Sequence, residues 1–304
     1  MKSITVFTPT YNRDYCLPIL YASLLRQTDP DFEWLVIDDG STDSTRELVQ
    51  GYIDEGRIAI RYHYKPNGGM HTGHNTAYAL IGTELNVCVD SDDYLPDNAI
   101  ARILFLYRRD GTPEYAGIIG LDATPEGEII GQRFPEDMKE CRFSELGPKY
   151  KVFGDKKIVY RTEIVKKLEP YPEFEGERFT PLYFPIIVDE KYKLLCYNEV
   201  FCLVDYQADG SSHNIFAQYF RHPKGFSHWR KMTMIYNPFW KRKFSHAVHY
   251  VATSIISRNR RFLSESPLKG MTLLAFPFGV ALYLYLLRKR NSVRDMSKLT
   301  QKPQ

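Results

Sequence analysis

Three carboxylates lie within four positions at the end of an apolar run, at Asp90, Asp92 and Asp93. Like charges this close disfavour one another, so the pattern calls for a cation. The hard ions Mg²⁺ and Mn²⁺ prefer oxygen ligands and usually take one or two protein carboxylates together with substrate phosphates. Asp90-Ser91-Asp92 therefore predicts a divalent-metal site for a phosphorylated substrate. The alternative is that the acids are solvated, and for Asp93 we expect a capping role at a helix that begins at Pro96.

The elements that must position these acids alternate between strand and helix. Val, Ile and Tyr enrich five segments, which is typical of strands: 3–9, 32–38, 58–64, 84–90 and 115–121. Helical patterns lie between them: an apolar stripe over 17–25, a capping-box pattern at Ser44 and Glu47, a segment over 72–82, and one from Pro96. Repeated strand–helix units predict an open, doubly wound, parallel sheet.

Ligands of such sheets bind beyond the carboxyl ends of the strands. Here the strand ends are polar and rich in glycine or proline: TPTYNR (8–13), DDGS (38–41), KPNGGMH (65–71) and DSDD (90–93). No GxGxxG follows the first strand, and no GxxxxGK[ST] occurs anywhere in the chain. Dinucleotide-binding and P-loop interpretations therefore lose their main support.

Together these strand ends resemble the GT-A glycosyltransferases, in particular glycosyltransferase family 2. The matching motifs follow in the family's order and spacing: Thr8-Pro9-Thr10-Tyr11-Asn12-Arg13, Asp38-Asp39-Gly40-Ser41, Asn67-Gly68-Gly69 and Asp90-Ser91-Asp92-Asp93. The resemblance implies an α/β, GT-A (Rossmann-like), doubly wound and mostly parallel sheet. It divides the chain into a glycosyltransferase domain over 1–215 and a basic helical region over 216–304. Within that domain, 1–125 would bind the nucleotide and 126–215 the acceptor.

The resemblance also implies a role for each matching residue. Asp39 would accept a hydrogen bond from uracil, and Asp92 would hold the divalent metal, Mn²⁺ or Mg²⁺. The other implied nucleotide contacts are Thr8, Pro9 and Tyr11 at the base, Asn67 and Gly68 at the backbone, and Asp90 near the ribose. His213, in YQADGSSHN, is a candidate second metal or phosphate contact. Pro9 and Asn67 could instead be turn residues, and Tyr11 a surface aromatic.

An inverting transfer also needs a base that deprotonates the acceptor hydroxyl. The stretch EFEGERFTP (173–181) resembles the FxGExF segment of related enzymes and places Glu177 at the acid. Glu175 is the competing candidate, and a solvated loop glutamate is the alternative interpretation.

The C-terminal part of the chain is strongly basic. From Arg221 onward it has 17 Lys and Arg but only 2 Asp and Glu. The uncharged stretch 271–287 holds 17 residues, fewer than the about 20 of a spanning helix. The sequence thus predicts a peripheral or monotopic attachment through 236–290 to the cytoplasmic face of the membrane. The alternative is that 271–287 forms a buried core helix. Binding of nucleic acid is disfavoured, because an uncharged stretch would play no part in it.

The composition is that of a globular protein, with 43% hydrophobic and 25% charged residues. Five scattered cysteines without a CxxC pair favour a reducing compartment. We also expect no signal peptide, because Asn12, Arg13 and Asp14 interrupt the first apolar stretch.

The sequence therefore predicts a metal-dependent, inverting glycosyltransferase of the hexosyltransferase class. The donor would be a nucleotide-sugar, with UDP favoured, and the acceptor a glycan or lipid-linked saccharide in cell-surface polysaccharide synthesis. Two alternatives stay open: a nucleotidyltransferase, and a non-catalytic scaffold at the membrane that binds nucleotide-sugar.

Overall fold

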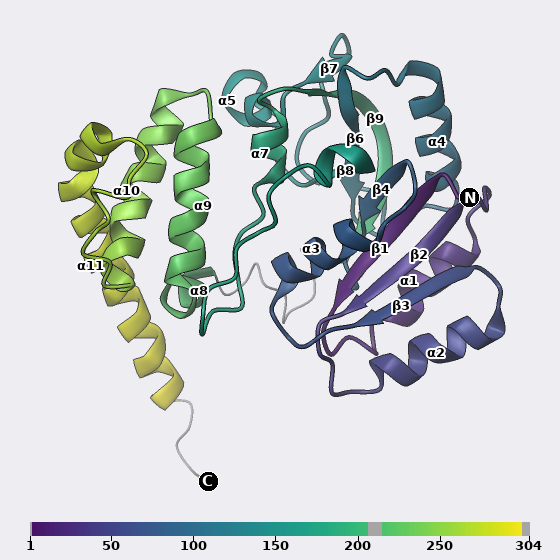
Figure 1. Ribbon diagram of the computed structural model, residues 1–304, viewed down its shortest axis with the longest axis horizontal. Coiled ribbons are helices and arrows are strands. Elements are labelled where there is room, and N and C mark those ends of the chain that lie inside the picture. The colour runs from purple at the N-terminus through teal and green to yellow at the C-terminus, as the bar shows by residue number, and fades with distance from the viewer. Residues whose placement is uncertain (1, 206–214, 300–304) are drawn as a thin grey trace. The chain divides into compact units, whose positions relative to one another are not determined.

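The computed structural model describes residues 2–205 and 215–299, and the chain divides into two compact units (Figure 1). The sheet unit comprises Met1–Tyr171 and Phe184–Gln207, and the helical unit comprises Pro172–Tyr183 and Ala208–Gln304. The short segment that carries Glu177 therefore belongs to the helical unit, although the sheet unit flanks it on both sides along the chain.

The sheet unit is built on one mixed sheet of nine strands in the order β3-β2-β1-β4-β8-β6-β9-β5, with β7 paired to β9. The strands are β1 (Ile4–Thr10), β2 (Phe32–Asp38), β3 (Ala59–Tyr64), β4 (Leu85–Cys88), β5 (Asp93–Tyr94), β6 (Tyr115–Ala123), β7 (Glu140–Cys141), β8 (Lys156–Arg161) and β9 (Lys193–Val204). Six of them (β1–β4, β6 and β9) run in the same direction. The expected α/β, mostly parallel architecture is confirmed, including all five expected strands.

Helices α1, α2, α3 and α4 occupy the expected intervals. The helices of the sheet unit are α1 (Leu17–Leu25), α2 (Thr45–Glu55), α3 (Met70–Leu80), α4 (Ala99–Asp110), α5 (Leu146–Tyr150), α6 (Thr162–Val165) and α7 (Phe184–Val188). The expected capping box does not form, because the Ser44 side chain makes no cap hydrogen bond. Asp43 takes that place, and its Oδ1 accepts from the amide of Thr45 at 3.1 Å.

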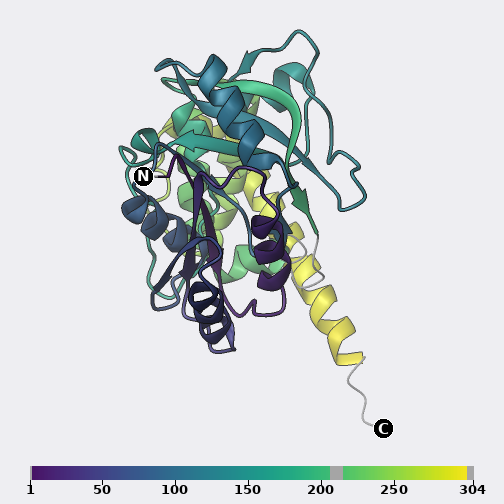
Figure 2. The same ribbon diagram turned by 90° about the vertical axis from the view of Figure 1, so that its right-hand side faces the viewer.

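Alternation along β1 and β2 distributes the helices over both faces of the sheet. Ile4, Val6 and Trp34 share one buried cluster with residues of α1, α2 and α4. On the opposite face, Phe7 lies edge-on to the rings of His74 and Tyr78 in α3. Figures 1 and 2 accordingly show α1 and α3 on opposite sides of these strands.

The helical unit contains α8 (Ile215–Arg221), α9 (Pro223–Tyr236), α10 (Trp240–Ile256) and α11 (Lys269–Leu299). Helices α10 and α11 cross closely at Gly279, where an added Cβ would lie 2.4 Å from Cβ of Val251. Two buried clusters hold the helices together, one around Tyr250 and Ala275 and the other around Phe226 and Leu286. The expected basic helical region is thus present, and α11 continues through Pro277 without a break.

His74 lies buried in α3 among aromatic and thiol groups. Its Nδ1 is 3.2 Å from the Tyr78 hydroxyl, and its Nε2 is 3.7 Å from Sγ of Cys88. Burial lowers the pKa of His74 from 6.5 to about 4. The folded protein therefore binds fewer protons at this site than the unfolded chain between these two pH values.

We predict that His74 contributes to acid sensitivity of the sheet unit. The contribution of His74 to the free energy of unfolding is fully present above pH 6.5. It falls as the pH drops toward 4, by up to about 3 kcal/mol. The non-titrating variant His74→Gln should lose less stability over the same pH range. Urea unfolding followed by circular dichroism at several pH values measures the difference, and equal losses in both proteins would contradict the prediction.

Candidate active site

The polar strand ends of β1 to β4 lie at one edge of the sheet. Backbone pairing continues past the strands: the amide of Asp39 donates to Thr10 O at 2.8 Å, and the amide of Lys65 donates to Asp38 O at 2.9 Å. The amide of Val89 likewise donates to Phe7 O at 3.0 Å, directly before Asp90. Parallel pairing therefore brings together the four motifs that sequence analysis singled out.

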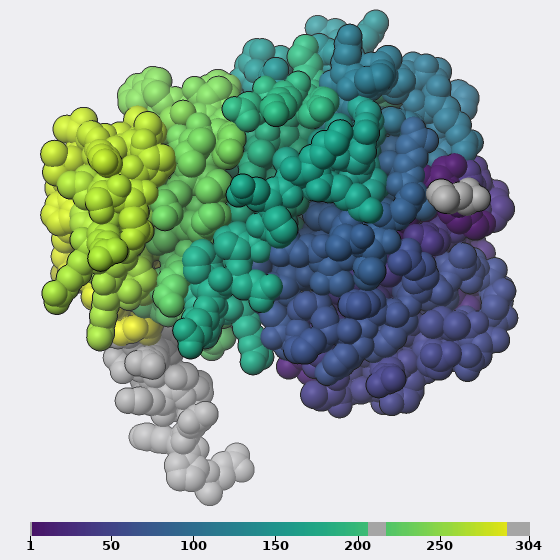
Figure 3. Space-filling view, in the orientation of Figure 1, coloured from purple at the N-terminus to yellow at the C-terminus, as the bar shows by residue number. Residues whose placement is uncertain are grey.

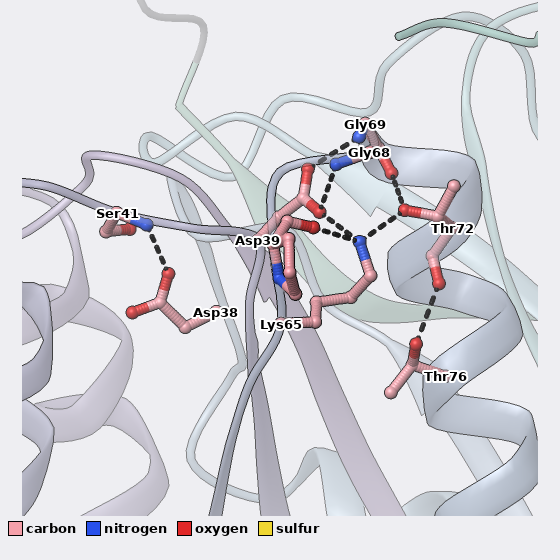
Figure 4. Close-up of polar contacts among 9 residues, drawn as sticks. Asp38, Asp39, Ser41, Lys65, Gly68, Gly69, Thr72 and Thr76 are labelled. Carbon is pink, nitrogen blue, oxygen red and sulfur yellow. Dashed lines mark hydrogen bonds and ion pairs between the residues drawn. The ribbon is translucent and has the colours of Figure 1, made fainter. Parts of the chain in front are cut away.

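Asp39 is the most strongly engaged residue at this edge (Figure 4). Its Oδ1 accepts from Lys65 Nζ at 2.5 Å and from the Gly68 amide at 2.9 Å, while Oδ2 accepts from the Gly69 amide at 2.7 Å. Its carboxylate is almost fully buried. Asp39 thus joins the end of β2 to the glycine-rich loop that leads into α3.

The other residues expected to contact the nucleobase differ in their solvent exposure. Thr8 is fully buried, and its Oγ1 accepts from Trp34 Nε1 at 3.0 Å, so its hydroxyl is engaged inside the core. Pro9 packs against α3 at Gly73. Tyr11 is 46% exposed just beyond β1, which leaves its ring available for stacking.

Asn67 and Gly68 follow a tightly confined path. Gly40 has a φ of +84°, and a Cβ there would lie 2.7 Å from the amide nitrogen of Asn67. At Gly68 an added Cβ would lie 2.7 Å from Thr72 Oγ1. Both glycines are therefore required by the close approach of the loop to its neighbours.

Hydrogen bonds also join the loops after β1 and β2. The backbone amide of Asn12 donates to Ser41 Oγ at 2.9 Å, and its side-chain Oδ1 accepts from the backbone amide of Thr42 at 2.8 Å. Asp38 is fully buried, accepts from the Ser41 amide at 2.8 Å and accepts from the Tyr62 hydroxyl. Sequence analysis assigned Asp38 no role, and its partner Tyr62 lies 24 residues away along the chain.

The three acids that follow β4 lie in different environments. Asp90 is exposed, Asp92 is half-buried and Asp93 is buried. The expected capping role of Asp93 is wrong: α4 begins at Ala99 with Asn98 as its N-cap. Asp93 instead belongs to β5, which pairs with β9 and thereby turns its carboxylate inward.

Inside the sheet unit, Asp93 forms an ion pair with Lys157. Because β8 runs opposite to β4, its first residues reach the edge where β4 ends, and Lys157 Nζ lies 3.4 Å from Asp93 Oδ2. Burial raises the pKa of Asp93 to about 7 and that of Asp122 to about 6. Burial opposes the charge of Lys157, but the surrounding acids hold its pKa well above the usual range. The acidic edge therefore contains an internal cation that sequence analysis missed.

The donor set fits a hard divalent ion that a substrate helps to bind. Among residues 2–205 and 215–299, no three His, Cys, Asp or Glu side chains form a group that could hold a metal by themselves. Asp90 and Asp92 offer carboxylate oxygens at an accessible edge, and a Mg²⁺ or Mn²⁺ ion needs few more protein ligands when phosphates complete its shell. His213 lies outside the described residues.

Glu177 lies in the helical unit, at the N-terminus of α9. Its Oε1 accepts from the Lys224 amide at 3.0 Å, and its Oε2 accepts from the Gly225 amide at 2.9 Å. The site is tight, because a Cβ on Gly225 would lie 2.2 Å from Phe179 O. Each carboxylate oxygen has a second lone pair, so Glu177 can still take a proton. Glu175, the competing candidate, is exposed.

Comparison with known proteins identifies relatives of this chain that match the segment carrying the strand-end motifs. A family model described as Glycosyl transferase family 2 matches residues 5–168. The chain is 31% identical over 140 residues to the chondroitin synthase of Pasteurella multocida, covering 45% of this chain and 14% of that protein. It is 34% identical over 97 residues to the poly(ribitol-phosphate) beta-N-acetylglucosaminyltransferase TarS of Staphylococcus aureus, covering 31% of this chain and 17% of TarS. The matches thus span less than a fifth of these relatives' length.

Solved structures share the fold over nearly the whole chain. Residues 1–349 of S. aureus TarS, in complex with UDP-GlcNAc, align with a TM-score of 0.57 and 16% identity, covering 96% of this chain and 92% of that one. The mannosyltransferase PcManGT from Pyrobaculum calidifontis, in complex with GDP-Man and Mn²⁺, aligns with a TM-score of 0.52 and 15% identity, covering 93% and 87%. These likenesses confirm the expected GT-A fold.

Proposed function

The chain belongs to Glycosyl transferase family 2, and we propose that it is an inverting glycosyltransferase with a UDP-sugar donor. Its acceptor would be a hydroxyl of a glycan or lipid-linked saccharide in cell-surface polysaccharide synthesis. The observation that carries the proposal is the shared strand edge, which holds both a buried carboxylate bound by a glycine-rich loop and the acids Asp90 and Asp92. The UDP-GlcNAc complex of TarS supports a UDP-linked donor, and the chondroitin synthase supports a glycan product.

In this proposal the strand ends of β1 to β3 bind the nucleotide. Asp39 accepts a hydrogen bond from the imide N–H of uracil through the remaining lone pair of Oδ2. Tyr11 stacks on the uracil ring, and the backbone of Asn67 and Gly68 approaches the nucleotide, with no side chain on Gly68 to block it.

Asp92, with Asp90 beside it, would hold the divalent ion against the diphosphate. A bound Mn²⁺ or Mg²⁺ supplies charge neutralisation for the departing nucleoside diphosphate. Asp90 is the more exposed of the two acids and lies next to the pairing of β4 with β1. It is therefore suited to a contact with the ribose.

Glu177 would act as the general base of the transfer. The acceptor hydroxyl gives its proton to the carboxylate while its oxygen forms a bond to the anomeric carbon. On the opposite face the bond from that carbon to the diphosphate oxygen breaks, and the electron pair leaves with UDP. The two amide donors from α9 fix the orientation of the carboxylate.

We also propose that the helical unit binds the cytoplasmic membrane surface. One described helix, Lys269–Arg290, is long and apolar enough to cross a membrane. Helix α11 packs beside α10 (Figure 1). Residues of these two helices lie in the yellow-green to yellow part of the surface in Figure 3. One stripe of α11 is used in that packing, so an in-plane, monotopic position is the better fit. The opposite stripe exposes large apolar side chains: Leu273, Leu274, Phe276, Phe278, Leu284 and Tyr285.

We predict that metal-dependent turnover requires Asp92. The purified chain with Mn²⁺ should release nucleotide from UDP-sugars but not from GDP- or dTDP-sugars. Asp92→Asn should lower kcat/KM roughly 100-fold or more, because it removes stabilisation of the leaving group. The control Asp97→Asn changes an acid that pairs with Arg26 on the surface. Normal turnover by Asp92→Asn would remove the metal assignment.

We predict a different kinetic signature for the base. Glu177→Gln should lower kcat roughly 100-fold or more while the Kd for UDP stays unchanged, because general-base catalysis acts only in the transition state. Glu175→Gln, two residues away, serves as the matched control. Thermal unfolding of both variants checks the contacts with α9. Retained transfer activity in Glu177→Gln would assign the base to another residue.

We predict that the apolar stripe of α11 controls membrane binding. The double variant Leu274→Glu and Phe278→Glu should sediment several-fold less with phosphatidylcholine–phosphatidylglycerol vesicles, because it replaces apolar side chains that would enter the membrane with charged ones. Ile19→Glu, which changes an exposed apolar residue of α1, is the control. Wild-type binding should also weaken without phosphatidylglycerol. Equal sedimentation of the double variant and wild type would contradict the membrane assignment.

A further inference from the structure

Lys65 directly follows β3, the outer strand beside β2, and has no assigned role in the proposed transfer reaction. Its Nζ donates to Asp39 Oδ1 at 2.5 Å, to Thr72 Oγ1 at 2.7 Å and to Pro66 O at 2.8 Å (Figure 4). An ammonium group has three N–H donors, so these three acceptors use all of them. Lys65 is therefore committed to the protein and is not a phosphate ligand.

The contacts of Lys65 organise the whole glycine-rich loop. Thr72, which accepts from Lys65, donates in turn to Gly69 O at 2.8 Å. A Cβ added at Gly68 would lie 2.7 Å from Thr72 Oγ1 and 3.0 Å from Lys65 Nζ, so a side chain there would displace one of these two groups. The ammonium group thus fills the space between the end of β2, the loop and the first turn of α3.

Lys65 also provides the countercharge of a buried acid. The side chain of Asp39 is 5% exposed and that of Lys65 is 17% exposed. A buried carboxylate that loses its cation is strongly disfavoured, so the loop around it is no longer held in one arrangement. An ionised carboxylate can only accept hydrogen bonds.

We infer that Lys65 is a positioning residue that makes the nucleotide site selective for uracil over cytosine. It holds Asp39 as an acceptor-only carboxylate and fixes the loop so that one lone pair of Oδ2 stays open. Uracil presents an N–H at ring position N3, and cytosine presents a lone pair there, so only uracil can donate from N3 to Asp39. This inference rests on the proposed function, because it assigns Lys65 to the same nucleotide site.

The choice between UDP and CDP isolates this effect, because the two differ only at the pyrimidine edge. Wild type should bind UDP at least about tenfold more tightly than CDP, as expected when a buried polar group rejects the wrong partner. In Lys65→Met, Asp39 loses one of its donors, and the loop that presents Oδ2 to uracil loses the contacts that Lys65 makes with Asp39, Thr72 and Pro66. The UDP:CDP ratio of Kd values should therefore move toward unity, mainly through weaker UDP binding.

The experiment measures Kd for UDP and CDP by calorimetry with Mn²⁺, on the full chain. Lys65→Arg keeps the charge and should retain most of the preference, while Thr72→Val removes one acceptor and should weaken it partly. Lys156→Met is the matched control: this lysine is also half-buried, but it donates to backbone carbonyls of 130–155 away from Asp39. Circular dichroism establishes that each variant is folded.

Two outcomes separate this inference from the proposed function. If wild type binds UDP but folded Lys65→Met keeps the wild-type UDP:CDP ratio, the role of Lys65 is wrong and the nucleotide site stands. If wild type binds neither nucleotide, the proposed function fails together with the inference. At saturating UDP-sugar, Lys65→Met should retain kcat within about threefold, because the contact between Asp39 and the uracil ring is made equally in ground and transition states. A large fall in kcat with unchanged Kd would also overturn the positioning role.

Discussion

Parallel pairing of β1 with β2 and β4 is the constraint on which the candidate site depends. Strands that run in the same direction end at the same edge, so residues far apart in the chain meet there. The backbone bonds from Asp39 to Thr10 and from Val89 to Phe7 extend the pairing past the last strand residues. Asp39, which we propose as a nucleotide contact, and Asp90 and Asp92, which we propose at the metal, therefore share one edge.

Each group of acids at this edge has its own lysine. Lys65 pairs with Asp39, and Lys157 pairs with Asp93. Both pairs are largely buried, so the lysines reduce the penalty of placing carboxylates in the interior. The half-buried Asp92 is left at the surface side of this arrangement. The edge where we propose that an anionic substrate binds can thus be rich in acids while the chain still folds.

Local patterns predicted the first half of the sheet well and the second half poorly. The strands over 3–121 and helices α1 to α4 follow from apolar periodicity and from turn residues, which act over a few positions. Strands β8 and β9 carried no comparable signal in the sequence analysis, although they complete the acidic edge. The same limit explains Asp93: its spacing before Pro96 indicated a cap, whereas pairing of β5 with β9 turned it inward.

The sequence by itself determined the fold class and the position of the acids at the strand ends, because hydrophobic alternation and motif spacing are local properties. It also marked Asp39, Asp92 and Glu177 as candidates through the order of motifs. Only the tertiary structure decided their partners. Lys65 is 26 residues from Asp39, Lys157 is 64 residues from Asp93, and Gly225 is 48 residues from Glu177. Such pairs form when burial makes an unpaired charge or polar group costly, and burial is a property of the folded chain.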